Sequence, residues 1–257
     1  MKTSSYYFIV LGVLLLSLIT ESFLPLFVIP SSLLLGYFIF SQLKLEKKIE
    51  WTGFSSMFSL LIFMTAVSQT YSLFSFGELI TTIDANTYFK FSIGNKPLVS
   101  LGELGVLTNA PLPTKIWSHI YQFFLQLNLT VTPWMGVLIN TILVAVSTSI
   151  TINTARMIFV RESYKIIYVL YYFMFSGLLW IFGSIHLRDA FALFLNTLIL
   201  FSIVLLWKTS NKRKMVFPIL IMIGSAIIMT YVRIEFTPIL ILISSSVPVF
   251  LLFNKKV

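Results

Sequence analysis

The sequence predicts an all-α protein: a polytopic transmembrane bundle of about eight spans, with a long outer loop that carries interfacial helices. Composition is the first evidence. Hydrophobic residues make up 58% of the 257 residues and charged residues only 11%, whereas a soluble domain has about 25% charged residues. The mean hydropathy is +0.94. These values exclude both an ordinary soluble domain and a disordered chain.

Apolar blocks of membrane length are the second observation. A membrane helix needs about 20 mainly apolar residues, and the chain contains eight such blocks separated by polar or charged residues. The first block is short and is followed by Glu21 and Pro25, so it is either a tilted span or half of a re-entrant hairpin. Lys2 and this block also fit a signal peptide, but no cleavage pattern follows, so we expect the block to be retained. The predicted spans are residues 6–20, 24–43, 51–73, 134–155, 166–183, 190–207, 215–231 and 237–253.

The distribution of basic residues is the third observation, and it orients the spans. Of the 18 lysines and arginines, 13 fall in alternate loops on one side and 5 on the other. Cytoplasmic loops carry the excess of basic residues. We therefore expect a multi-pass protein of the plasma (inner) membrane, with both termini in the cytoplasm. The whole chain, 1–257, is then one integral membrane domain. The net charge of +9 is explained by topology, and no nucleic-acid partner is predicted.

The loop at 74–133, between the third and fourth spans, is the only long one and is expected outside. Residues 83–91 read as a short helix, because apolar residues recur there at helical spacing. Residues 114–127 read as a second, amphipathic helix. Its aromatic stripe suits the headgroup level of a bilayer, so we expect it to lie in the outer interface. The stripe consists of Trp117, Ile120, Tyr121, Phe124 and Leu127.

Several kinds of chemistry are excluded by residue type. The chain has no cysteine and only two histidines, so thiolate chemistry and a multi-histidine zinc site are not expected. It has no phosphate-binding glycine loop and no metal-ligand spacing, so neither a cofactor nor a metal ion is predicted. No charged residue falls deep within a predicted span, which argues against an ion path through the bilayer centre.

Asp84 is the first candidate for chemistry. It opens the short helix at 83–91 and has Tyr88 one turn further on. Asp84 is either a solvated acid favoured by the helix dipole or a carboxylate base held at the membrane surface.

Two further groups of ionisable residues fall on the same predicted face. His186, Arg188 and Asp189 open the sixth span, and Arg233 and Glu235 follow the seventh. They are either anchors at the membrane surface or ligands for an anion, since a guanidinium binds phosphate through two hydrogen bonds. A carboxylate and two guanidiniums at this depth fit the headgroup of a lipid-linked phosphate.

The order of these features resembles bacterial GT-C-type membrane glycosyltransferases and the related EpsG-like and Wzy-like polysaccharide polymerases. The resemblance rests on Asp84 and Tyr88 in an early outer loop, on the aromatic helix that follows Pro113, and on the pair Arg188-Asp189 at the start of a span. It implies sugar transfer for polysaccharide biosynthesis on the extracytoplasmic face, from a polyprenyl-phosphate-linked donor to a glycan acceptor.

The resemblance also implies roles for individual residues. Asp84 would act as the general base, and Arg188 would stabilise the departing lipid phosphate. Tyr88 could stack on a sugar. From its position on the same face, and not from the resemblance, Arg233 is expected to contact the phosphate a second time. His186 and Glu235 are expected to help bind the substrate. Two alternatives stay open: a transporter or flippase for a lipid-linked glycan, and a non-catalytic membrane subunit that packs against a membrane-protein partner.

Overall fold

The computed structural model describes residues 2–42, 48–79, 82–94, 111–159, 163–209 and 212–233, together with four residues between 242 and 249. All the regular secondary structure in these ranges is α-helical. The helices in chain order are α1 (Lys2–Ile19), α2 (Leu24–Gln42), α3 (Lys48–Phe76), α4 (Ile83–Ile93), α6 (Pro111–Gln126), α7 (Pro133–Ile158), α8 (Ser163–Met174), α9 (Gly177–Ser184), α10 (Asp189–Lys208) and α11 (Lys212–Thr230).

Fewer helices than expected are long enough to cross a membrane. In the described part of the chain, α3, α7, α10 and α11 are long and apolar enough, and a fifth span is possible if α8 and α9 form one broken span. The first two predicted spans are represented by shorter apolar helices, and the eighth, 237–253, lies mostly outside the described residues. A multi-pass membrane protein is thus supported, whereas the predicted number of eight spans is not confirmed.

The block at 166–183, which we expected to form one span, is broken. α8 and α9 meet at an angle of 55°, and Phe175 and Ser176 lie between them. The indole Nε1 of Trp180 donates a hydrogen bond of 2.7 Å to the carbonyl oxygen of Met174 at the break. A carbonyl freed from a helix needs such a partner, because hydrocarbon offers none.

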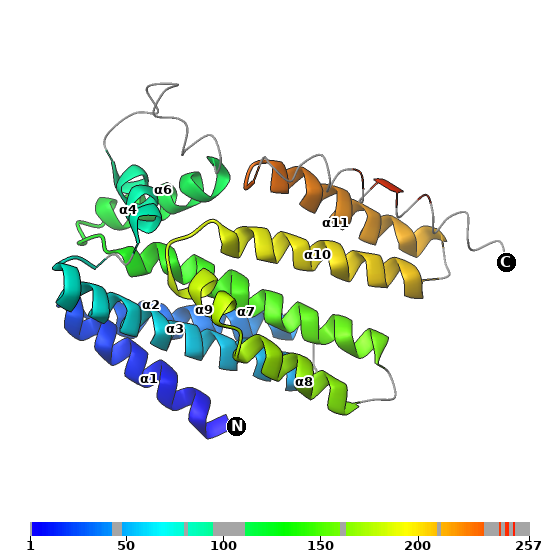
Figure 1. Cartoon of the computed structure of the whole chain (residues 1–257), viewed down its shortest axis with the longest axis horizontal. Helices are drawn as coiled ribbons and strands as arrows, with labels where there is room; N and C mark the ends of the chain where they lie inside the picture. Colours follow the sequence, from blue (N-terminus) through cyan, green and yellow to red (C-terminus); the bar gives the residue numbers. More distant parts are fainter. Residues whose placement is uncertain are drawn as a thin grey trace.

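α7 is the central helix of the bundle. It packs against α3, α9, α10 and α8, while α1 packs on α3 and α11 on α10 (Figure 1). Residues on all sides of α7 are consequently buried, including several serines and threonines that bond their own helix. At one end of the bundle Arg156 Nη1 lies 2.6 Å from Glu50 Oε1, joining the end of α7 to the start of α3.

Two short helices, α4 and α6, pack on each other at the opposite end of the bundle (Figure 1). They occupy the positions of the two helices predicted between the third and fourth spans. The Thr82 hydroxyl accepts a hydrogen bond of 3.1 Å from the Ala85 amide and so caps α4. The Leu112 amide donates a bond of 3.1 Å to the Tyr231 carbonyl, which ties the start of α6 to the end of α11.

The aromatic stripe of α6 faces protein along its centre, which corrects our expectation of a stripe facing the membrane interface. Trp117 and Tyr121 are completely buried, and only Leu127 at its end is more than half exposed. The polar side, including Lys115 and His119, is exposed as predicted. The stripe faces inward because α4 and the start of α7 offer it aromatic and apolar partners.

Candidate functional site

His186 lies at the centre of an aromatic cluster beneath α4 and α6. Its ring centroid is 3.9 Å from that of Trp117, 5.9 Å from that of Tyr121 and 6.3 Å from that of Phe89. Only 2% of the residue is exposed. Neither ring nitrogen has a hydrogen-bond partner among the described residues.

Burial lowers the pKa of His186 from 6.5 to about 3, and contact with its own main chain acts weakly in the opposite direction. Desolvation penalises the charged imidazolium, so the ring is neutral at physiological pH. A neutral imidazole has one donor and one acceptor nitrogen. His186 is therefore no cationic partner for a phosphate, and its ring can contribute to binding only through hydrogen bonds.

The α9–α10 connection, which carries His186, is held by two polar side chains from the interior of α7. Asn140 Nδ2 donates hydrogen bonds of 2.8 Å to the carbonyl oxygens of both Ile185 and Leu187. The Thr141 hydroxyl donates one of 2.8 Å to Gly183. The last carbonyl groups of a helix have no hydrogen-bond partner within the helix, and these bonds satisfy such groups after α9. The bonds also fix the main chain on both sides of His186.

Charged groups from three elements act electrostatically on the Tyr88 phenol. Burial raises the pKa of Tyr88, while Arg188 lowers it, Asp84 and Asp189 raise it, and Arg233 lowers it. Asp84, Arg188 and Arg233, three of the predicted site residues, thus all influence one side chain, although α4 and the end of α11 are far apart in sequence. We call these charges the charged cluster.

The members of this charged cluster differ in exposure and pairing. Asp84 is exposed in the first turn of α4, and Arg188 is partly exposed at the residue before α10. Arg233 Nη2 lies 2.6 Å from Asp189 Oδ1, forming an ion pair that joins the end of α11 to the start of α10. The ion pair holds the Arg233 guanidinium at Asp189, the residue that follows Arg188 in sequence.

Two predicted site residues need separate comment. Tyr88 is 6% exposed, and its ring centroid lies 5.6 Å from that of Trp117; stacking of Tyr88 on a sugar stays a prediction. Tyr88 is packed because the face of α4 that carries it lies against α6. Glu235 lies outside the described residues.

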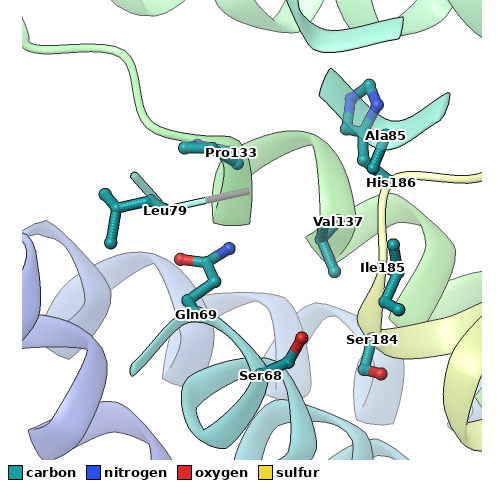
Figure 2. Close-up of a pocket in the computed structure, with 9 residues that line it drawn as sticks. All are labelled: Ser68, Gln69, Leu79, Ala85, Pro133, Val137, Ser184, Ile185 and His186. Atoms are coloured by element: carbon teal, nitrogen blue, oxygen red, sulfur yellow. The ribbon is translucent and has the colours of Figure 1, made fainter. Parts of the chain in front are cut away.

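A small pocket lies beside the charged cluster, between α3, α4, the start of α7 and the α9–α10 connection (Figure 2). Its empty volume of about 250 Å³ includes solvent at its mouth, so its enclosed part is small. Its lining contains no charged side chain among the described residues. The lining residues are Ser68, Gln69, Leu79, Ala85, Pro133, Val137, Ser184, Ile185 and His186.

Sequence reasoning overlooked Gln69, Asn140 and Gly136, which all contribute to this end of the bundle. Gln69 and Asn140 are polar residues within long apolar blocks, 3% and 0% exposed. That pattern could have marked them, since buried polar side chains require partners. Gly136 lies where the Tyr121 and His186 side chains approach α7. Nothing in the sequence around Gly136 indicates that approach.

Within the described ranges, no group of three or more histidine or acidic side chains is placed to hold a metal ion. Comparison of the chain with protein-family models, with curated proteins and with solved structures finds no match. The candidate site therefore stands on its own geometry.

Proposed function

We propose that this chain is a membrane glycosyltransferase or polysaccharide polymerase that takes its sugar from a polyprenyl-phosphate-linked donor on the extracytoplasmic face of the cell membrane. The observation that carries the proposal is that Asp84, Arg188 and Arg233 all act on Tyr88, while the ion pair of Arg233 with Asp189 joins the end of α11 to the start of α10. These groups are a carboxylate and two guanidiniums, contributed by α4, the start of α10 and the end of α11. They lie where apolar helices of membrane length end, which is the depth of a lipid headgroup.

The proposed reaction assigns one step to each group. Asp84 accepts the proton of an acceptor hydroxyl while that oxygen attacks the anomeric carbon of the donor. The bond between the anomeric carbon and the phosphate oxygen breaks, and polyprenyl phosphate leaves. Arg188 stabilises the charge on the departing phosphate, and Arg233, oriented by Asp189, supports it from the other side.

Asp84→Asn tests the proposed base. The substitution keeps the volume of the side chain and removes its basicity, so transfer should fall by about 10²–10⁴-fold while membrane insertion is unchanged. The measurement uses the purified chain in nanodiscs, a panel of polyprenyl-phosphate-linked hexoses and a glycan acceptor. Glu21→Gln is the matched control, because Glu21 is an exposed acid in the turn between α1 and α2. It should keep full activity.

Arg188→Lys tests the phosphate contact with the charge preserved. Lysine offers a point charge in place of a planar fork, so donor affinity and transfer should both fall. If Asp84→Asn and Glu21→Gln transfer sugar equally well, Asp84 is not the base. If the wild type moves lipid-linked sugar across the bilayer without transferring it, the chain is a transporter. If it does neither and acts only with a second membrane protein, it is a non-catalytic subunit.

A further inference from the structure

We infer that the pocket beneath α4 is a subsite for a neutral, hydroxyl-bearing group, with Gln69 as the residue that recognises it. Given the proposed function, that group is a hydroxyl of the donor's sugar. The inference rests on the proposed function for the identity of the ligand, while the subsite itself rests on the geometry of the pocket.

Buried hydrogen-bonding groups without partners line the pocket. Gln69 is 3% exposed, and its Oε1 has no hydrogen-bond partner among the described residues. Figure 2 shows its carboxamide and the Ser68 hydroxyl rising from α3 toward the space between Pro133 and His186. His186, also on the lining, has two unpaired ring nitrogens. A buried polar atom left unpaired costs folding free energy, so the unpaired Gln69 oxygen on this lining points to a ligand that pairs with it.

The chemistry of the lining selects the ligand. The described residues that line the pocket carry no charged side chain, so none of them offers a counter-charge to an ammonium or carboxylate group. A hydroxyl both donates and accepts, and it therefore satisfies the Gln69 carboxamide in either orientation. The pocket is small and open at its mouth, so it admits a single hydroxyl group rather than a whole headgroup.

Two residues that line the pocket are close in sequence to members of the charged cluster. Ala85 and His186 line it, and Ala85 follows Asp84 directly, while His186 is two residues before Arg188. One ligand with an anionic part and an adjacent neutral hydroxylated part would span both. A sugar linked to a lipid phosphate has this form, whereas a phospholipid with an ammonium headgroup lacks it.

The test compares binding of two kinds of synthetic lipid to the full chain in nanodiscs. One is bare polyprenyl phosphate. The others are the same lipid linked to glucose, galactose, mannose or N-acetylglucosamine. At least one sugar-bearing lipid should bind to the wild type more tightly than the bare lipid. Gln69→Leu should lower the affinity for that lipid by about fivefold to tenfold, the effect of one lost hydrogen bond. Its affinity for bare polyprenyl phosphate should not change, which also shows that the variant is folded.

Two further variants sharpen the comparison. Val137→Leu adds a methylene to the same lining and should reduce the same preference without removing a polar group. Gln122→Leu makes the chemical change of Gln69→Leu on the exposed side of α6 and should leave both affinities unchanged.

The outcomes separate the subsite from the proposed function. If Gln69→Leu keeps the wild-type preference, or if no sugar-bearing lipid binds better than the bare one, the subsite is wrong, even if the chain transfers sugar. If the preference exists and depends on Gln69 but no sugar is transferred, the subsite stands and the glycosyltransferase proposal fails.

Discussion

Gly136, in the first turn of α7, shows how one missing side chain shapes the candidate site. A Cβ at this position would lie 2.1 Å from the Tyr121 hydroxyl oxygen and 2.6 Å from His186 Nε2. Real Cβ atoms do not approach other atoms so closely. The Tyr121 hydroxyl also donates a hydrogen bond of 3.4 Å to the Pro133 carbonyl. The glycine thus lets α6 and the loop with His186 reach the α7 backbone together.

Gly136→Ala should therefore destabilise the protein by about 1–3 kcal/mol, the usual effect of overpacking a filled site. The melting temperature of the purified chain in detergent measures the change. Gly224→Ala is the matched control, since no atom lies within 4 Å of a Cβ placed there. Alanine has the higher helix propensity, so Gly224→Ala should be neutral or stabilising. Equal melting temperatures for the two variants would contradict the close approach at Gly136.

At the scale of elements, the connection between α9 and α10 depends on α7. Main-chain carbonyls at 183, 185 and 187 accept hydrogen bonds from Thr141 and Asn140. A connection of four residues with these bonds cannot move independently of α7. Arg188 and Asp189, at its end, are consequently positioned by a helix that contributes no charged group to the site.

Asn140→Ala should loosen this connection and lower stability by about 1–3 kcal/mol, because the Leu187 carbonyl loses its side-chain donor and the Ile185 carbonyl keeps only the Leu187 amide. Thermal unfolding in detergent measures the loss of stability, and limited proteolysis detects cleavage between α9 and α10. Asn196→Ala, on the exposed side of α10, is the control and should behave like the wild type. Cleavage at the same rate in both variants would show that Asn140 does not hold the connection.

At the scale of the whole molecule, the two ends of the bundle carry different groups. α4, α6 and the α9–α10 connection lie at one end, and the last turns of α7 and α10 and the first turns of α8 and α11 lie at the other (Figure 1). The second end contains Arg156, Lys208 and Arg213, which belong to the basic-rich loops. This arrangement is compatible with the topology expected from the basic residues, in which the end with the candidate site faces outward.

Single cysteines test that topology directly, because the native chain has none. His119→Cys, on the exposed side of α6, should react with a membrane-impermeant maleimide added to intact cells. Lys214→Cys, exposed near the start of α11, should react only after the membrane is permeabilised. The reverse pattern would invert the topology and place the candidate site in the cytoplasm.

How much the sequence predicted differs between the helices and the site. The ranges of α3, α7, α10 and α11 followed closely from apolar blocks of membrane length, and those of α4 and α6 from helical periodicity. The break between α8 and α9 was not predicted, because a short interruption leaves the mean hydropathy of a block unchanged. The surroundings of His186 were also not predicted, since its ring partners come from α4 and α6.

The sequence by itself determined that this is an all-helical, multi-pass membrane protein, because composition and the length of apolar runs are properties of the chain alone. It also identified Asp84, Arg188 and Arg233 as charges near the ends of helices. Only the tertiary structure decided that all three act electrostatically on Tyr88, that the α6 stripe faces protein, and that Gln69 and His186 line one pocket. Those outcomes depend on which helices pack together, and packing is set by the fit between side chains distant in sequence. For the same reason, Gly136 and Asn140 acquire their roles only when the bundle is assembled.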